Sequence, residues 1–265
     1  MTDRRAAFRA LHHAGRPFLL PNAWDHASAA ALAARGHPAI GTTSLGVAAA
    51  AGRPDGVAAT GAETLALARR LARLPVLLTV DVEAGFADDP AAVAGYVTEL
   101  AGLGAVGINL EDGRADGTLA DPECIADKIA AVKAAVPDLF VNARTDTWWL
   151  GVADPLPQTL ARARTYRAAG ADGIFVPGTV DLPTLRVLTE RIDAPLNALY
   201  QPGGPGLDEF GRAGVARVST GSLLFRAALA AAVATADAAR ADGFVASPGL
   251  PSYAEVQGLV AADGD

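Results

Sequence analysis

The sequence is poor in cysteine and lysine, and it has no long uninterrupted apolar run. Its single cysteine, Cys124, excludes an internal disulfide and a cysteine-based zinc cluster. With two lysines and a formal net charge of −7, the chain has no basic patch of the kind that binds nucleic acid. No apolar run reaches the roughly 18 residues of a membrane span, and the basic start has no apolar segment behind it. We therefore expect a cytoplasmic protein that binds neither nucleic acid nor membranes.

Apolar residues, by contrast, make up 51% of the 265 residues, enough for a large core. Short apolar runs alternate with alanine-rich segments that carry helix start and stop signals. The expected strands are Phe18–Pro21, Ala39–Thr42, Val76–Val80, Val106–Leu110, Leu139–Ala143, Gly173–Val176, Pro195–Leu199 and Ala216–Ser219. Strands that alternate with helices in this way predict one (β/α)8 barrel domain over residues 1–265, with a doubly wound open sheet as the alternative.

Acidic and hydroxyl residues mark where several helices should begin. Asp25, Asp89 and Asp121 each stand where a side chain can cap a first turn, the last two directly before a proline. Thr60 and Glu63 have the spacing of a capping box. These signals place helices between the strands, as a barrel requires.

Charged side chains gather where three successive strands end: Asp81 and Glu83, then Glu111, then Arg144. Side chains alternate along a strand, so Asp81 and Glu83 should face the same side. In a barrel these strand ends carry the active site. Three carboxylates without a nearby cysteine or histidine form a hard oxygen-ligand set, which predicts a Mg²⁺ or Mn²⁺ site. The Arg144 guanidinium can clamp an anionic substrate through two hydrogen bonds.

Two loops should add polar groups to the same end of the barrel. The stretch Gly41–Gly46 offers hydroxyls and backbone N–H groups for an anion. Its candidate contacts are Ser44, Leu45 and Gly46. The long stretch 50–56 is a candidate lid, and Asp55 on it can add a carboxylate to the outer shell of the metal. Trp24, after the first strand, is expected to line the pocket.

Taken in order, these motifs resemble those of the isocitrate lyase/phosphoenolpyruvate mutase superfamily. The stretches that carry the resemblance are Leu20-Pro-Asn-Ala-Trp24-Asp25, Gly41-Thr-Thr-Ser44-Leu-Gly46, Gly52-Arg-Pro-Asp55, Asp81-Val-Glu83-Ala-Gly85-Phe, Asn109-Leu-Glu111-Asp112 and Asn142-Ala-Arg144-Thr-Asp146. The resemblance covers most of the chain. It implies a barrel that forms homodimers or homotetramers, often by exchange of the last helix between subunits. It also implies Mg²⁺ and the making or breaking of a C–C or P–C bond beside an enolpyruvate.

The same resemblance implies roles for individual residues. Those that would hold Mg²⁺, directly or through water, are Asp81, Glu83 and Glu111. Those that would contact the substrate are Trp24, Ser44, Gly46 and Arg144. Asp55 would lie on a gating loop, and with Arg144 it is the candidate for a catalytic role.

One segment departs from the best-known members of the superfamily. The lyases that cleave isocitrate and methylisocitrate carry a Lys-Lys-Cys-Gly-His segment as a mobile acid loop. Here the stretch after Glu111 reads Asp112-Gly-Arg-Ala-Asp-Gly-Thr118. The absence of the Lys-Lys-Cys-Gly-His segment favours a reaction that needs little help from a general acid. We therefore predict a Mg²⁺-dependent lyase that cleaves a C–C bond, by decarboxylation or retro-aldol cleavage, in a small 2-keto or 2-hydroxy carboxylate.

The sequence is also consistent with three other functions. A mutase or hydrolase could act on the P–C bond of a phosphonopyruvate-like compound. The stretches Gly173–Gly178 and Val218–Ser222 resemble the phosphate-binding strand ends of other barrels, which would suit a metal-free sugar-phosphate enzyme. A barrel that only binds a metabolite, without catalysis, is the third.

Overall fold

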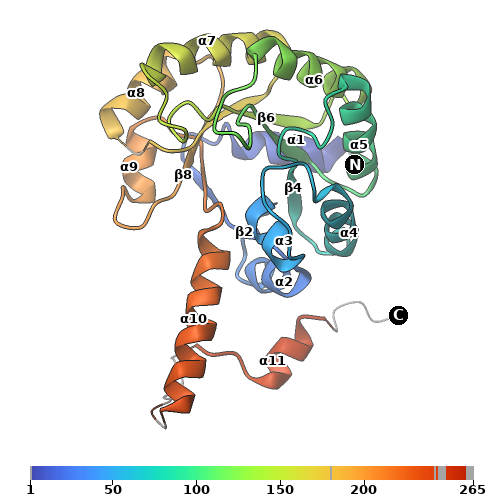
Figure 1. Ribbon diagram of the computed structural model, residues 1–265, viewed down its shortest axis with the longest axis vertical. Helices are drawn as coiled ribbons and strands as arrows, with labels where there is room; N and C mark the ends of the chain where they lie inside the picture. The colour runs from blue at the N-terminus through green and yellow to red at the C-terminus, as the bar shows by residue number, and fades with distance from the viewer. Residues whose placement is uncertain (1, 180, 242, 244–248, 261–265) are drawn as a thin grey trace.

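The computed structural model describes residues 2–179, 181–241, 243 and 249–260 (Figure 1). In this part of the chain, parallel strands form one sheet in the order β1-β9-β8-β7-β6-β5-β4-β3-β2. The strands are β1 Phe18–Leu20, β2 Asn22–Ala23, β3 Ala39–Thr42, β4 Leu77–Asp81, β5 Gly107–Glu111, β6 Phe140–Arg144, β7 Gly173–Val176, β8 Leu196–Leu199 and β9 Arg217–Ser219.

Strands β1 and β2 form a single strand position, because only Pro21 separates them. β1 pairs with β9 and β2 pairs with β3, so the two ends of the sheet meet. The Asn22 side chain joins both sides of this seam. Its Nδ2 donates to the Thr42 carbonyl at 2.8 Å, and its Oδ1 accepts from the Gly221 backbone N–H at 2.9 Å. The predicted (β/α)8 barrel is therefore confirmed, and the alternative of a doubly wound open sheet is not.

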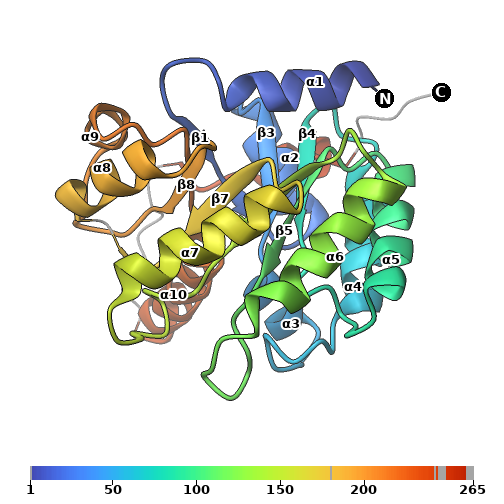
Figure 2. The ribbon, with the colours of Figure 1, turned by 90° about the horizontal axis from the view of Figure 1, so that it is seen from above.

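Helices follow the strands and surround the sheet (Figure 2). They are α1 Thr2–Leu11, α2 His26–Ala34, α3 Ser44–Ala50, α4 Gly61–Leu71, α5 Pro90–Gly102, α6 Pro122–Ala135, α7 Pro155–Ala168, α8 Leu182–Arg191, α9 Leu207–Arg212, α10 Leu223–Arg240 and α11 Tyr253–Gly258. Asp25, Asp89 and Asp121 cap α2, α5 and α6 as predicted. The predicted capping box at α4 is wrong, because the Thr60 side chain bonds to Glu83 and not to its own helix.

Three strands begin and end one residue later than the sequence suggests. β4, β5 and β6 therefore include Asp81, Glu111 and Arg144 as their last residues. The Cα of Glu111 lies opposite that of Arg144 in the ladder, and that of Asp81 lies opposite that of Asn109. The key charged side chains thus stand on hydrogen-bonded backbone and not on the loops that follow.

Helix α1 packs across the N-terminal ends of the strands. Phe8 is fully buried there, and the His12 ring stacks on the Phe140 ring with centroids 4.0 Å apart. Burial, helped by the positive charge of Arg217, lowers the pKa of His12 to about 3, so its imidazole is neutral. This aromatic cluster fills the barrel at the N-terminal ends of the strands and leaves the space at their C-terminal ends for a ligand.

Helix α10 extends away from the barrel (Figure 1). Two of its apolar side chains, Leu229 and Val233, are 52% and 63% exposed, and Tyr253 of α11 is 83% exposed. Within the described residues, every helix is too short or too polar to cross a membrane. Among the described residues, none covers these exposed apolar side chains of α10 and α11.

Candidate active site

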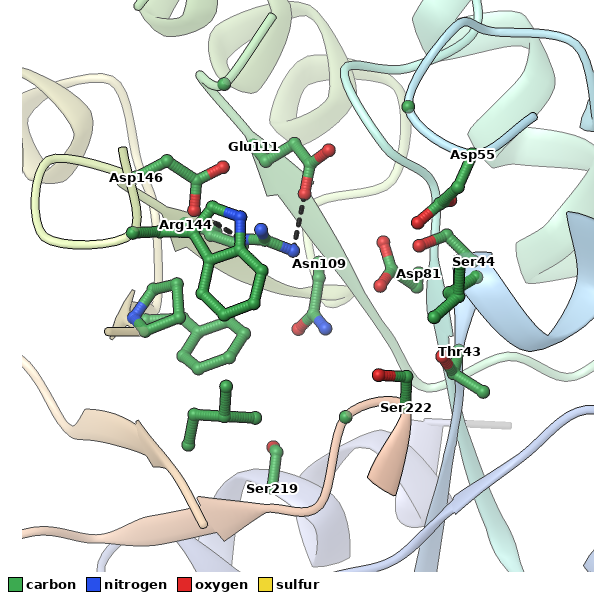
Figure 3. Close-up of a pocket in the computed structure, with 18 of the residues that line it drawn as sticks. Thr43, Ser44, Asp55, Asp81, Asn109, Glu111, Arg144, Asp146, Ser219 and Ser222 are labelled. Carbon is green, nitrogen blue, oxygen red and sulfur yellow. Dashed lines mark hydrogen bonds and ion pairs between the residues drawn. The ribbon is translucent and has the colours of Figure 1, made fainter. Parts of the chain in front are cut away.

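A cavity of about 280 Å³ opens at the C-terminal ends of the strands (Figure 3). Its charged lining residues are Asp55, Asp81, Glu111, Arg114, Arg144 and Asp146. Among the uncharged ones are Thr43, Ser44, Leu45, Asn109, Trp149, Phe175, Ser219 and Ser222. This volume lies at the small end of the range for ligand sites, so it suits a molecule of a few carbon atoms.

Most of the residues predicted for the site line this cavity, from β3 to β6 and the loops above them. They are Ser44, Leu45, Asp55, Asp81, Glu111 and Arg144. Trp24 and Gly46 lie behind the wall. The Trp24 ring packs edge-on against Phe225 of α10, with centroids 5.4 Å apart. A Cβ at Gly46 would lie 2.7 Å from the Trp24 Cβ, so only glycine allows this close packing.

The Glu83 carboxylate points to a different partner. It is buried, and it accepts hydrogen bonds at 2.9 Å from the backbone N–H of Ala58 and from the hydroxyl of Thr60. Glu83 has φ +49°, so the chain has already left the strand and the alternation of side chains no longer applies. The same-face prediction therefore does not extend to Glu83, which fastens the loop 51–60 that carries Asp55.

Arg144 stands between two carboxylates. Its Nη1 lies 2.7 Å from Glu111 Oε2, its Nε donates to Asp146 Oδ1 at 2.7 Å, and its guanidinium carbon lies 5.7 Å from the centroid of the Phe175 ring. Burial alone would lower the pKa of Arg144, but the negative charges of Glu111 and Asp146 outweigh it and raise that pKa. Arg144 is thus permanently charged and held in one orientation.

The carboxylates of the cavity outnumber its buried cation. Burial raises the pKa of Asp81 to about 6, against the opposing effect of Arg144, and it also raises the pKa of Glu111. One oxygen of Asp55 is buried without a hydrogen bond from any described residue. These acids are poorly neutralised by the chain itself, and a bound cation would offset their charge.

The donor set fits Mg²⁺ better than a metal held by protein ligands alone. Among the described residues, no three His, Cys, Asp or Glu side chains are grouped so that they could hold a metal ion. Mg²⁺ usually keeps several water ligands and takes only one or two carboxylates from the protein. Asp81 and Glu111 can supply these, with Asp55 near the waters.

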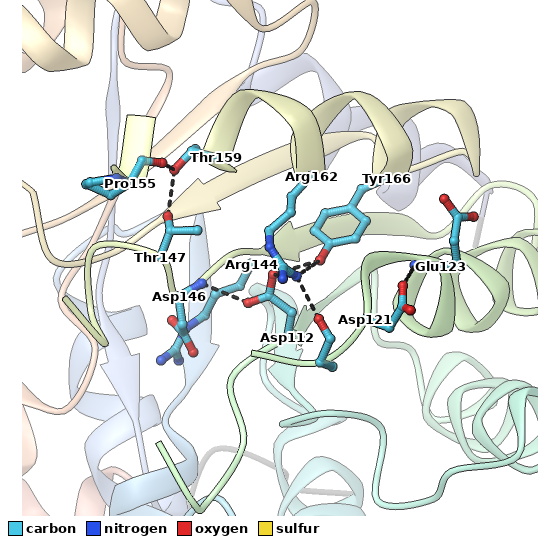
Figure 4. A network of polar contacts seen from close by, with 11 residues as sticks. Asp112, Asp121, Glu123, Arg144, Asp146, Thr147, Pro155, Thr159, Arg162 and Tyr166 are labelled. Carbon is cyan, nitrogen blue, oxygen red and sulfur yellow. Dashed lines mark hydrogen bonds and ion pairs between the residues drawn. The ribbon is translucent and has the colours of Figure 1, made fainter. Parts of the chain in front are cut away.

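A second layer of polar contacts fixes the position of Asp146 (Figure 4). The fully buried Asp112 accepts from the Tyr166 hydroxyl at 2.7 Å, from Arg162 Nη1 at 3.0 Å and from the Asp146 backbone N–H at 2.8 Å. Because Asp146 in turn binds Arg144, helix α7 helps to hold the Arg144 guanidinium in position. Such supporting contacts preserve the geometry that an active site needs.

The model of the phosphoenolpyruvate phosphomutase family matches residues 8–240. The chain belongs to this family. Relatives by sequence include proteins named 2-methylisocitrate lyase and oxaloacetate decarboxylase.

Three proteins illustrate the similarity. An uncharacterized protein of Mycobacterium tuberculosis (strain ATCC 25618 / H37Rv) is 48% identical over 95% of each chain. The oxaloacetate decarboxylase of Ectopseudomonas mendocina (strain ymp) is 33% identical, over 86% of this chain and 82% of the relative. The crystal structure of a protein from Burkholderia cenocepacia J2315, provisionally assigned as a phosphonomutase, is 38% identical with a TM-score of 0.84. It covers 89% of this chain and 99% of its own.

Within this member of the phosphoenolpyruvate phosphomutase family, the structure adds lining residues that sequence reasoning did not single out. Asn109 stands two residues before Glu111 in β5, so strand alternation could have placed it in the cavity. Trp149, on the loop after β6, gave no such signal. Ser219 and Ser222 were expected only for a separate phosphate site, but they line the same cavity as the acids.

Proposed function

We propose that this chain is a Mg²⁺-dependent lyase that cleaves a C–C bond of a small 2-keto or 2-hydroxy carboxylate through an enolpyruvate-like intermediate. The observation that supports it is a small cavity at the strand ends whose carboxylates exceed its buried cation, with Asp81 and Glu111 on adjacent strands. Relatives named oxaloacetate decarboxylase and 2-methylisocitrate lyase agree with this chemistry.

In this proposal Asp81 and Glu111 hold Mg²⁺ directly or through water, and Asp55 faces the outer shell from its loop. Mg²⁺ held there would supply Lewis-acid stabilisation of the negative charge that develops on the substrate as the bond at C3 breaks. Glu83 acts at one remove, since it anchors the loop that carries Asp55.

The remaining predicted residues orient the substrate. Arg144, fixed by two carboxylates, donates its free N–H groups to a substrate carboxylate. Ser44 and Leu45 form the opposite wall. Gly46 and Trp24 shape that wall from behind, as their tight packing requires.

Arg114 supports a substrate with a second carboxylate. It lines the cavity from the segment that replaces the acid loop of better-known relatives, and no described acidic side chain pairs with it. A free guanidinium at the edge of the site can pair with the far end of a dicarboxylate. This favours a 2-keto dicarboxylate as the substrate.

We also propose that the protein is a homodimer or homotetramer that exchanges α10. The exposed Leu229 and Val233 of this helix support the proposal, because a chain alone leaves them in water. Sedimentation of the purified protein tests it: a single species of one-chain mass would contradict it.

A second candidate is a mutase or hydrolase acting on a P–C bond. The 38% identity to the provisionally assigned phosphonomutase favours it, and the Ser222 hydroxyl could serve a phosphonate oxygen in the same cavity. The two candidates share the metal and the enolate and differ in the group that leaves.

The test is a calorimetric titration of oxalate, a planar stand-in for the pyruvate enolate, with and without Mg²⁺. Binding that requires Mg²⁺ is expected, followed by formation of pyruvate from oxaloacetate well above the rate with Mg²⁺ alone. Phosphate release from phosphonopyruvate would favour the second candidate, and binding without any turnover a metabolite-binding barrel. No oxalate binding in either condition would overturn the metal-and-enolate proposal.

A further inference from the structure

Arg217 lies inside the barrel with no exposed surface. It belongs to β9, and its Nε donates to Ser219 Oγ at 3.0 Å while its Nη2 donates to Asn109 Oδ1 at 3.2 Å. None of the described acidic side chains forms an ion pair with it. A charged side chain without a counter-charge is unusual in a barrel interior, which branched apolar residues normally fill.

The Arg217 side chain reaches across the barrel. Strands β8, β7 and β6 stand between β9 and β5 in the sheet, so the contact with Asn109 crosses the interior. Both of its partners, Asn109 and Ser219, line the cavity. Arg217 therefore supports the floor of the site from beneath, in a place that the proposed reaction does not use.

The charge on Arg217 is costly to bury. Burial lowers the pKa of Arg217 to about 9, although the negative charge of Asp81 acts in the opposite direction. The guanidinium thus stays charged at neutral pH. Since an apolar side chain would fill the same space at lower cost, the contacts of Arg217 call for a role beyond packing.

The hydrogen bonds around Asn109 determine which end of its amide faces the cavity. Its Oδ1 accepts from Asn142 Nδ2 at 2.9 Å and from Arg217 Nη2. A guanidinium has only donors, so it must face the oxygen of the amide and not the nitrogen. The Asn109 Nδ2 makes no hydrogen bond to any described residue, and it is left with two N–H groups at the floor of the cavity, near Asp81 and Arg144 (Figure 3).

Ser219, the other partner, has its hydroxyl proton already engaged. Its Oγ accepts from Arg217 Nε and donates to Asn197 Oδ1 at 3.1 Å. Ser219 can therefore offer the cavity only a lone pair. Of the two side chains that Arg217 holds, Asn109 is the one that presents donors.

We propose that Asn109 is a substrate-binding residue whose amide N–H groups donate to a carboxylate or enolate oxygen, and that Arg217 is the positioning residue that holds the amide in this orientation. The inference rests on the proposed function in taking a small oxyanion as the ligand. It adds a donor on the floor of the site, from a residue to which the sequence analysis assigns no role.

The test measures oxalate affinity at saturating Mg²⁺ in a double-mutant cycle of Asn109→Ala, Arg217→Met and the two combined. Asn109→Ala is expected to weaken binding about tenfold to a hundredfold, as the loss of a hydrogen bond to a charged group does. Arg217→Met should weaken it about three- to tenfold by freeing the amide. The double variant should bind no more weakly than Asn109→Ala, because Arg217 acts through Asn109.

The matched control is Arg164→Met, the same chemical change on an exposed arginine of α7. It should leave the affinity unchanged. If Arg217→Met does not fold, Arg217→Lys keeps the buried charge and takes its place in the cycle. Thermal unfolding of each variant separates lost binding from lost structure.

The possible outcomes distinguish failure of the proposed function from failure of the roles of Asn109 and Arg217. A parent protein that fails to bind oxalate with Mg²⁺ overturns the proposed function and this inference with it. A parent that binds, beside an Asn109→Ala variant that binds equally well, overturns only the role of Asn109. Additive losses in the cycle would show that Arg217 supports the barrel generally, and they would overturn its positioning role.

Discussion

Asp81 and Glu83 stand two residues apart, yet they belong to different regions of the molecule. Asp81 is the last residue of β4 and lines the cavity, whereas Glu83 lies on the turn beyond it and fastens the loop 51–60. Strand alternation holds as long as the ladder holds; one residue further, the turn decides where a side chain points. Proximity in a motif therefore does not guarantee a shared role.

The two regions also differ in how the acids are neutralised. Glu83 has two donors at 2.9 Å, while the carboxylate of Asp81 accepts one bond, from the Glu83 backbone N–H at 3.2 Å. Burial raises the pKa of both. The Glu83 carboxylate is thus satisfied by hydrogen bonds within the chain, whereas the Asp81 carboxylate keeps acceptor capacity for a ligand.

Asp81→Asn should have the largest effect. We expect Mg²⁺-dependent oxalate binding to weaken at least a hundredfold, or about 2.7 kcal/mol, since a metal ligand is lost. Without metal, the melting temperature should hold or rise, because a poorly neutralised carboxylate is removed. The control is Asp88→Asn, on the exposed loop after the motif. Unchanged oxalate affinity in Asp81→Asn would remove Asp81 from the metal site.

Glu83→Gln should have a smaller effect and a different one. A neutral amide weakens the bonds from Ala58 and Thr60 by about 1.5 kcal/mol, so the loop should open roughly tenfold more often. Hydrogen exchange at the Ala58 amide measures this opening. Oxalate affinity should fall less than tenfold. A loss as complete as that in Asp81→Asn would make Glu83 a metal ligand and remove the distinction between the two acids.

The stability of the metal-free protein should depend on pH through Asp81. The folded pKa of Asp81, about 6, exceeds the ordinary value of 3.8, so its contribution is fully present below about pH 4 and is lost as pH rises through 6. Metal-free protein should therefore lose of the order of 1–2 kcal/mol relative to Asp81→Asn between pH 4 and 7. Urea unfolding of both proteins measures it. His12, whose lowered pKa acts in the opposite sense, is present in both and cancels.

Thr60→Val tests the smallest effect. It keeps the shape of the side chain but removes the hydroxyl that donates to Glu83, which should cost about 1 kcal/mol of unfolding free energy. Thr98→Val, which removes a hydroxyl bonded within its own helix, serves as the control and should change the stability by less than half as much. Equal losses of unfolding free energy in the two variants would mean that the bond from Thr60 to Glu83 stabilises the protein no more than a hydroxyl bonded within a helix.

Much of the fold followed from local patterns. Apolar runs and capping residues such as Asp89 located strands and helices, because both signals act over a few residues. Asp81, Glu111 and Arg144, which line the cavity, were recognisable as candidates because charge at the end of a buried strand has few other uses. The strand boundaries shifted by one residue, since ladder pairing includes polar residues that propensity excludes.

What the sequence could not provide are contacts between distant parts of the chain. The bond from Thr60 to Glu83 replaced a capping box that local spacing favoured. The bond from Arg217 to Asn109 joins residues 108 positions apart across the barrel, and no periodicity reports it. Such contacts depend on closure of the whole sheet, which a local pattern does not contain.

The seam at Asn22 has a consequence for the synthesis of the chain. Its Oδ1 accepts from the backbone N–H groups of Thr220 and Gly221, 198 and 199 residues later. At roughly 5–20 residues per second, a nascent chain waits on the order of 10–40 s between making Asn22 and making its partners. Throughout that interval the first strand has an unpaired edge, so the ribosome-bound protein is most open to misassociation just before its last strand emerges.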